Sequence, residues 1–458
     1  MFAGPVAGLF FPLRTVLRID GRDYSPAVLD KIVTAGGDCK SFQHAARQLE
    51  KLAEVPISKT HVSTLTHQIG RELIAVRDRE AELHRYRQLP ADANQPPVEL
   101  ACVETDGARL MTRAPHQSRG VHEEQWKEPK VGVLWRMTGE AFADDPHPEL
   151  PRCFQDPKRV PELVREIHGG AVASPKESEP DRSPDKPLRR TADLDSSSPT
   201  RESWQPQRIF RTCVATLHDV YGFGPLVAAE AQKRGFYQAQ RKVFVADGQD
   251  ANWTVHRLHF PEFTAVTDFM HAVAYVYAAA QAMTSPDQLW PQYLRYATAC
   301  WQGRTEEMIA ELEPWLAAHP LPKTGPLKEI SSTDPRKIVH EALTYLRNNR
   351  ERMKYPEYRR MGLPVTSSLV ESLIKEINWR VKGTEKFWNR PELAATSRST
   401  SRSVGGRERE LPDQSAESIL QVRAALLSDN HRLEKHIHSR PGSPFVRRTP
   451  QANTSHAM

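Results

Sequence analysis

The segment Arg241–His271, RKVFVADGQDANWTVHRLHFPEFTAVTDFMH, contains two short apolar runs that each end on a carboxylate. The first run, Val243–Val245, predicts a buried strand that stops at Asp247, and the later AV run predicts a strand that stops at Asp268, three residues before His271. In α/β sheets ligands bind beyond the carboxyl ends of the strands, so acids placed there indicate a site. The alternative is that each aspartate only caps the helix that follows it.

Length and composition predict a soluble globular protein. A chain of 458 residues can form two or three domains, and 39% apolar residues with 8% aromatics can fill their cores. No apolar run reaches the roughly 18 residues of a spanning helix, and the first residues do not resemble a secretory signal, so we expect a cytoplasmic protein with no membrane partner. Five scattered cysteines without a CxxC pair imply neither a disulfide framework nor a zinc ribbon. A net charge of +6 favours anionic partners such as nucleic acid.

Helix signals dominate residues 1–90. Ser25, Ser41 and Ser58 each precede a run with apolar residues at helical spacing, which predicts three helices joined by tight turns. This arrangement is typical of a helix-turn-helix DNA-binding domain, in which the third helix would contact DNA. A helical bundle with no DNA role is the alternative. The candidate DNA-binding residues lie off the apolar stripe of the third helix and are Lys59, Thr60, His61, Thr64 and Arg71.

An α/β core is predicted in two parts, at residues 98–169 and 204–271. The first part begins with VELACVETDGARL, Val98–Leu110, where alternating apolar residues predict a strand that ends at Asp106. Because Asp-Gly is also a hairpin signal, Asp106 could instead only make a turn. The run Lys130–Arg136 predicts a partner strand. Residues 170–203, rich in Ser, Pro and charged side chains, predict a disordered insertion between the two parts.

The rest of the chain is predicted to be helical. Residues 272–352 contain apolar residues at three- and four-residue spacing, which indicates an all-helical insertion. Residues 353–395 contain a further helix that carries Glu371, although a glutamate on a helix is usually a solvated surface residue. A low-complexity linker is predicted at residues 396–414, followed by a C-terminal helix and a basic tail at 415–458.

Cations and aromatics alternate after Glu371. Such a mixture suits contact with the nucleic-acid backbone combined with stacking on an exposed base. Core aromatics beside a solvated charged face would give a similar pattern. The candidate DNA-binding residues here are Lys375, Arg380, Lys382, Lys386 and Trp388.

Taken in order, these features form a recognisable pattern: strand with Asp106, strand with Asp247, strand with Asp268 and His271, helical insertion, helix with Glu371. This pattern resembles the DDE transposases of bacterial insertion sequences, particularly those related to the Mutator group, which carry a Cys-or-Asp, two residues, His motif. The resemblance is densest in VADGQDANW, TDFMHA and GLPVTSSLVESLIKEINWRVKG. It implies an α/β fold, with a ribonuclease-H-like mixed sheet core, an all-helical insertion and a small helical N-terminal domain.

The resemblance also implies a chemistry and a set of site residues. It makes Asp106, Asp247 and Glu371 both the catalytic acids and the metal ligands. They would hold two Mg²⁺ ions about 3.5–4 Å apart, for which Mn²⁺ can substitute. Asp268 and His271 match the auxiliary motif and are expected to orient the insertion or the DNA rather than bind metal, because a histidine ligand would favour softer metals.

The expected partners follow from this family. They are double-stranded DNA, both the terminal inverted repeats of the element and the target, and further copies of the chain in a homodimer or higher oligomer associated with the bacterial nucleoid. Two alternatives remain: an inactivated or domesticated relative that binds DNA without cutting it, and a ribonuclease-H-like nuclease acting on an RNA-containing duplex. The helical insertion argues against the second, because a stand-alone nuclease needs no such insertion.

Overall fold

The computed structural model describes residues 24–90, 96–107, 110–113, 125–167, 204–322, 330–381, 388–389 and 416–440. The chain forms two compact units. We call the larger one, Asp78–Arg109 with Glu128–Asn378, the sheet unit, and the other, Met1–Arg77 with Leu110–Lys127 and Trp379–Met458, the helical unit. Within the described part of the chain, no helix is both long enough and apolar enough to span a bilayer.

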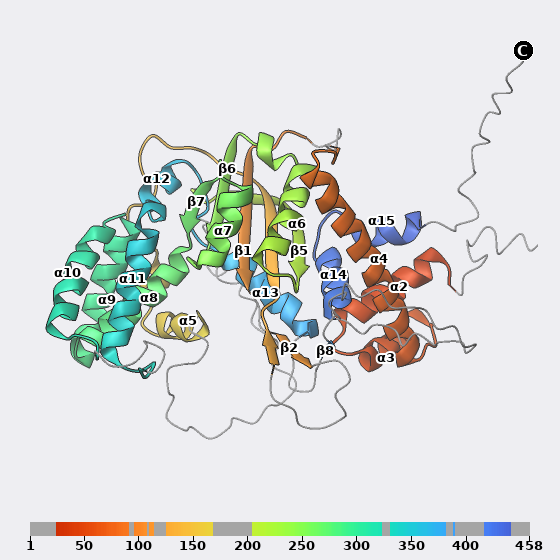
Figure 1. Ribbon diagram of the computed structural model, residues 1–458, viewed down its shortest axis with the longest axis horizontal. Coiled ribbons are helices and arrows are strands. Elements are labelled where there is room, and N and C mark those ends of the chain that lie inside the picture. Colours follow the sequence, from red (N-terminus) through yellow and green to blue (C-terminus); the bar gives the residue numbers. More distant parts are fainter. Residues whose placement is uncertain are drawn as a thin grey trace, which may run out of the picture. The chain divides into compact units, whose positions relative to one another are not determined.

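The sheet unit has an α/β fold built on a five-stranded mixed sheet (Figure 1). The strand order is β5-β4-β1-β6-β7. Strand β4 is antiparallel to both β1 and β5, whereas β1, β6 and β7 run parallel to one another. The sheet strands are β1 (Leu100–Gly107), β4 (Lys130–Thr138), β5 (Gln207–Thr216), β6 (Arg241–Ala246) and β7 (Thr264–Thr267). The predicted strands ending at Asp106, Asp247 and Asp268, and the predicted partner strand at Lys130–Arg136, are thereby confirmed.

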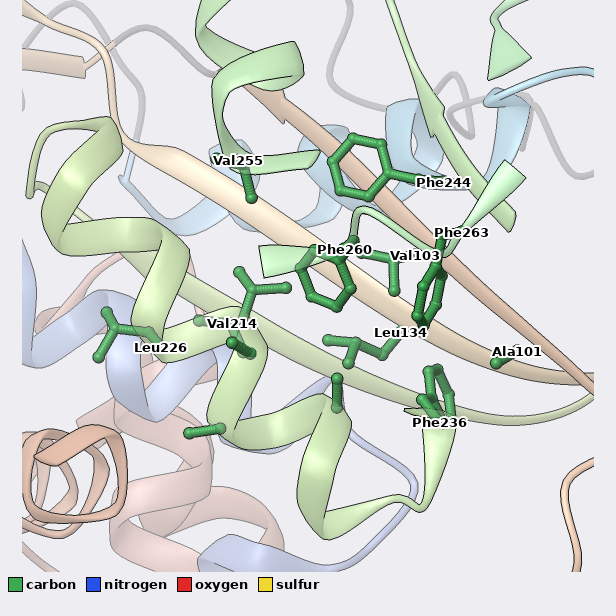
Figure 2. Close-up of a cluster of buried hydrophobic side chains, with 14 of the residues drawn as sticks. Ala101, Val103, Leu134, Val214, Leu226, Phe236, Phe244, Val255, Phe260 and Phe263 are labelled. Atoms are coloured by element: carbon green, nitrogen blue, oxygen red, sulfur yellow. The ribbon is translucent and has the colours of Figure 1, made fainter. Parts of the chain in front are cut away.

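One face of this sheet packs against helices α6 (Val220–Lys233) and α7 (Asp250–His259). Alternate strand residues point to this face, and the side chains of Val103, Leu134 and Phe244 meet Phe260 there, as Figure 2 shows. Asp219 caps helix α6 by accepting a hydrogen bond from the Gly222 amide at 2.9 Å. The remaining short elements are η1 (Arg152–Phe154), α5 (Arg159–Ile167) and η3 (Phe236–Gln238).

The predicted all-helical insertion is confirmed. Helix α8 packs against α9 and α11, and α10 packs against α9 and α11, so that these helices form a bundle at one end of the sheet unit (left in Figure 1). Pro286 and Pro335 occupy the first positions of α9 and α11, whereas Pro291 and Pro314 lie inside α9 and α10. The elements of this region are α8 (Phe269–Met283), α9 (Pro286–Trp301), α10 (Thr305–Ala318), α11 (Pro335–Asn349), η5 (Arg350–Arg352), α12 (Tyr355–Arg360) and α13 (Ser368–Val381).

The helical unit combines segments from both ends of the sequence. Helices α2 (Pro26–Asp38) and α3 (Phe42–Ala53) begin at the predicted caps, where Ser25 and Ser41 each accept a backbone hydrogen bond. The core also includes residues of two helices near the other end of the chain, α14 (Ala416–Leu426) and α15 (Arg432–Ser439). This unit also contains a three-stranded sheet of order β3-β2-β8, made of β2 (Leu110–Arg113), β3 (Gln125–Lys127) and β8 (Trp388–Asn389).

Two expectations about the N-terminal helices are corrected. The third helix, α4 (Lys59–Arg85), has 27 residues and is not a short recognition helix. The boundary between the compact units falls inside α4, after Arg77, and not at residue 90. The predicted insertion at 170–203 and the predicted linker at 396–414 lie outside the described residues.

Candidate active site

Three aspartates lie at the carboxyl ends of three neighbouring parallel strands. The strand register places Thr105 of β1 beside Ala246 of β6, and Ala246 beside Thr267 of β7. Asp106 follows Thr105, Asp247 follows Ala246 and Asp268 follows Thr267 in the sequence. The Asp268 amide continues the ladder by donating to the Ala246 carbonyl at 2.8 Å.

The alternation of side chains also puts these acids on a common face. Val103 and Phe244 contribute to the core under α6 and α7, so Asp106 belongs to the opposite face, two residues after the buried Glu104. Asp247 and Asp268 have the same parity in the register. The register thus places Asp106 and Asp247 at the same edge of the sheet, where the sequence analysis expected acids at strand ends.

The carboxylate of Asp247 is almost fully buried and held in one orientation. Its Oδ1 accepts hydrogen bonds from the Gln249 amide at 3.0 Å and from Asn252 Nδ2 at 2.8 Å. Among the described residues, none donates to Oδ2. One oxygen of this acid is thus fixed by the protein, and the other is available to a ligand.

The turn after Asp247 is shaped by helix α11. Gly248 has φ +98, and a Cβ at this position would lie 2.6 Å from Tyr345 Cε2. The hydroxyl of Tyr345 donates to the backbone carbonyl of Asp247 at 3.2 Å. This contact needs both a glycine in the turn and the helical insertion on which Tyr345 lies, so the insertion helps to build the site.

Asn349 at the end of α11 is a second site residue that the sequence did not indicate. Its Oδ1 accepts hydrogen bonds from Trp253 Nε1 at 3.1 Å and from Thr267 Oγ1 at 3.3 Å, and its Nδ2 donates to the Tyr345 carbonyl. It links α7, β7 and α11 directly behind the acids. A polar residue on a helix carries no signal in a single sequence, and only the fold reveals that Asn349 is buried.

Asp268 is completely buried and accepts four hydrogen bonds. Its Oδ1 receives the amides of Met270 and Ser367, and its Oδ2 receives the Ser367 hydroxyl at 2.7 Å and His271 Nδ1 at 2.6 Å. Burial alone would raise the pKa of Asp268, but the hydrogen bonds from His271 and Ser367 and the charge of His271 lower it. Asp268 caps α8, as one of the two sequence interpretations proposed, and it also accepts hydrogen bonds from Ser367 and His271.

His271 carries a positive charge beside the acids. Burial would lower its pKa, but the hydrogen bond to Asp268 and the negative charges of Asp268, Asp247 and Asp106 raise the pKa to about 10. The imidazolium therefore offsets part of the repulsion among carboxylates gathered at this edge.

Glu371 lies in the first turn of α13, as predicted, although its side chain is outside the described residues. The helix is anchored by Leu373 and Ile377, which are buried, as the apolar stripe in the sequence predicted. Lys375, on the opposite side of the helix, is exposed and pairs with Glu166 at 2.8 Å.

The side chains at this edge are of the chemical type that a divalent metal ion needs as ligands. Asp106 and Asp247 supply carboxylate oxygens, which hard cations such as Mg²⁺ prefer, and Glu371 is the expected third ligand. Among the described side chains, no group of three His, Cys, Asp or Glu residues has the geometry of a complete metal site. The side chain of Glu371 is not among those described.

The candidate DNA-binding residues of α4 differ in accessibility. Lys59, Thr60 and Arg71 are exposed. His61 and Thr64 are half-buried; the His61 ring packs edge-on against Tyr24, and the Thr64 hydroxyl donates back to the Thr60 carbonyl at 3.0 Å.

The structure corrects the prediction made for Arg380. It was expected to contact DNA phosphates, but it is buried in the helical unit, where its Nε donates to the Gly36 carbonyl at 2.9 Å and its guanidinium lies 4.4 Å from the centre of the Phe42 ring. Burial lowers its pKa to about 10. The reason is periodicity: Arg380 follows Ile377 by three residues, which places it on the buried side of α13. Lys382, Lys386 and the side chain of Trp388 lie outside the described residues.

No model of a known protein family matches the chain, and no curated protein matches it.

Proposed function

We propose that this protein is a DNA transposase with a ribonuclease-H-like core, which cleaves and joins the ends of its own insertion element by metal-dependent phosphodiester chemistry. The observation that carries the proposal is the strand register, which aligns Asp106 with Asp247 at the ends of neighbouring parallel strands. The phosphorus attacked in phosphodiester cleavage is shielded by negative charge, so the reaction needs divalent metal ions. Carboxylates arranged in this way can hold such ions.

The sheet topology supports the same proposal. Numbered one to five along the chain, the strands of the large sheet lie in the order three-two-one-four-five, and only the second is antiparallel to the others. This is the order expected of a ribonuclease-H-like core. The helical insertion separates the second acid, Asp247, from the helix that carries Glu371, as in the resembled transposases.

The acids and the residues hydrogen-bonded to them have different roles in this proposal. Asp106, Asp247 and Glu371 would hold two Mg²⁺ ions, which when bound activate the attacking oxygen and stabilise the leaving one. Hydrogen bonds from Gln249 and Asn252 keep the Asp247 carboxylate oriented before any metal arrives.

DNA recognition is assigned to α4. Lys59, Thr60 and Arg71 are exposed. The two cations can neutralise phosphates, and the Thr60 hydroxyl is a candidate for contact with a base edge or a phosphate. An inactive DNA-binding relative would need α4 but not the three strand-end aspartates, so their common register favours the active enzyme. Homodimer formation on DNA and association with the nucleoid remain parts of this proposal.

The test is a cleavage assay on a duplex that carries the ends of the element, in the presence of Mg²⁺. Asp247→Asn should abolish cleavage and leave DNA binding about unchanged, because the acid holds metal and not DNA. Asp250→Asn, which changes an exposed acid three residues further on, is the matched control and should cleave normally. Equal loss of binding and cleavage in Asp247→Asn, or normal cleavage, would contradict the proposal.

A further inference from the structure

The chain segment that leads into α13 is bonded to the end of β7. The Phe269 amide donates to the Val365 carbonyl at 3.0 Å. Two residues on, Ser367 donates its amide to Asp268 Oδ1 at 3.0 Å and its hydroxyl to Asp268 Oδ2 at 2.7 Å. These three hydrogen bonds join segments that lie about a hundred residues apart in the sequence, and two of them end on one carboxylate.

That carboxylate is immobile. Asp268 has no exposed surface, and its own amide is held by the Ala246 carbonyl, the residue before Asp247. Both of its oxygens are engaged, since Met270 and His271 supply the other two donors. A helix cap alone requires only the Met270 contact, so the contacts with Ser367 and His271 go beyond capping.

Ser367 immediately precedes α13, and Glu371 follows it by four residues, which is about one helical turn, or roughly 6 Å along the axis. The start of this helix is therefore positioned by Asp268, which is itself fixed beside Asp247.

We propose that Asp268, acting through Ser367, is the positioning residue for the third metal-binding acid, Glu371. The inference rests on the proposed function, because it gives Glu371 its role as a metal ligand. Asp268 does not contact the metal; it sets the distance between the helix that carries one ligand and the strand ends that carry the other two.

The experiment measures Mn²⁺ binding to the full chain, with free Mn²⁺ followed by electron paramagnetic resonance. Ser367→Ala removes one hydrogen bond to Asp268 and should weaken Mn²⁺ binding about tenfold, the usual size of an effect transmitted through a partner of a ligand. Asp268→Asn should do the same. Thr366→Ala, at the half-buried neighbouring position, is the control and should bind as the wild type does.

A double-mutant comparison shows whether the effect passes through Glu371. Glu371→Gln should itself weaken Mn²⁺ binding, and adding Ser367→Ala to it should then change the affinity less than about twofold, because the residue to be positioned is already lost. A general structural role would instead weaken binding by the same factor in both backgrounds. That result, or unchanged affinity in Ser367→Ala alone, would overturn the inference.

Hydrogen exchange separates this inference from the proposed function. Ser367→Ala should speed amide exchange in the first turn of α13 about tenfold, while Thr366→Ala should not, whether or not metal binds. If Asp247→Asn and Glu371→Gln both leave Mn²⁺ binding and cleavage unchanged, the proposed function fails, and the exchange result still tests the contact. Unchanged exchange in Ser367→Ala would overturn the positioning role even in an active transposase.

Discussion

The hydroxyl of Tyr345 donates a hydrogen bond to the backbone carbonyl of Asp247, across 98 residues of sequence. The contact brings the helical insertion to the strand end that carries the second acid. Tyr345 is buried, and its ring stacks on Tyr275 with a centroid separation of 3.9 Å. The insertion therefore contributes to the geometry of the acidic edge as well as to the size of the unit.

Removing this hydroxyl should affect cleavage more than a comparable change elsewhere. Tyr345→Phe leaves a buried carbonyl without its partner, and we expect a loss of about 1 kcal/mol in unfolding free energy together with slower cleavage. Tyr293→Phe is the matched control, since the Tyr293 hydroxyl donates to the Phe154 carbonyl at 2.8 Å and not to a strand-end aspartate. Urea unfolding and a cleavage assay on both variants make the comparison; equal cleavage rates would remove Tyr345 from the site.

Gly248 should tolerate a side chain less well than another glycine of similar conformation. Gly235→Ala imposes only backbone strain, about 1–2 kcal/mol, because φ is +67 and no atom lies within 4 Å of the new Cβ. Gly248→Ala adds a collision with Tyr345 to a φ of +98 and should cost about 1–3 kcal/mol more. Thermal or urea unfolding of the two variants measures the difference, and equal destabilisation would mean that Tyr345 moves aside freely.

The pair formed by Asp268 and His271 predicts a pH dependence of stability. The pKa of His271 is raised to about 10 in the folded protein, against about 6.5 when unfolded, so its contribution is complete below pH 6.5 and is lost as the pH rises towards 10. The pKa of Asp268 is lowered, so its contribution is present above about pH 4 and is lost as the pH falls through the folded value.

Replacing the histidine should therefore matter most at moderately acidic to neutral pH. The stability difference between wild type and His271→Gln should be largest near pH 6 and should shrink steadily up to pH 9.5. Urea unfolding at half-unit pH intervals provides the measurement. A difference that stays constant over this range would show that His271 does not carry the charge assigned to it.

Arg380 should behave as a core residue and not as a DNA contact. Arg380→Met keeps the apolar stem but removes the hydrogen bond to the Gly36 carbonyl, so we expect a loss of about 2 kcal/mol in unfolding free energy. The salt dependence of DNA binding by the folded variant should be unchanged. Lys375→Met, at an exposed ion pair, should cost less than about 1 kcal/mol. A salt slope that falls by about one unit in Arg380→Met would restore the phosphate contact.

The sequence was most informative where one chemical pattern determines one local structure. Alternating apolar residues before Asp106 and a short apolar run before Asp247 predicted strands, and strand periodicity then put both acids at one edge of the sheet. The helices of residues 272–352 were equally predictable, because their apolar residues recur at three- and four-residue spacing.

The residues that hold the acids in place were not predictable in this way. Tyr345 and Asn349 act through contacts with residues far away in the sequence, and neither belongs to a pattern with its neighbours. Ser367 lies in a stretch where the resemblance is dense, but its hydrogen bonds to Asp268 follow only from the fold. Arg380 was misassigned for the opposite reason. A cation among aromatics is typical of a nucleic-acid surface, and only the packing of α13 reveals that this one faces inward.

The helical unit has a consequence for how the protein is made. Its core joins α2 and α4 to α14 and α15, and His67 Nδ1 contacts Ser418 Oγ at 2.6 Å, across 351 residues of sequence. At roughly 5–20 residues per second, a ribosome needs on the order of 20–70 seconds to pass from the first of these residues to the second. The helices that begin the chain must wait that long for the partners that complete their core. A chain interrupted at any point before Ser418 thus lacks a finished helical unit, and full assembly of that unit is reserved for chains in which all segments of the sheet unit have already been synthesised.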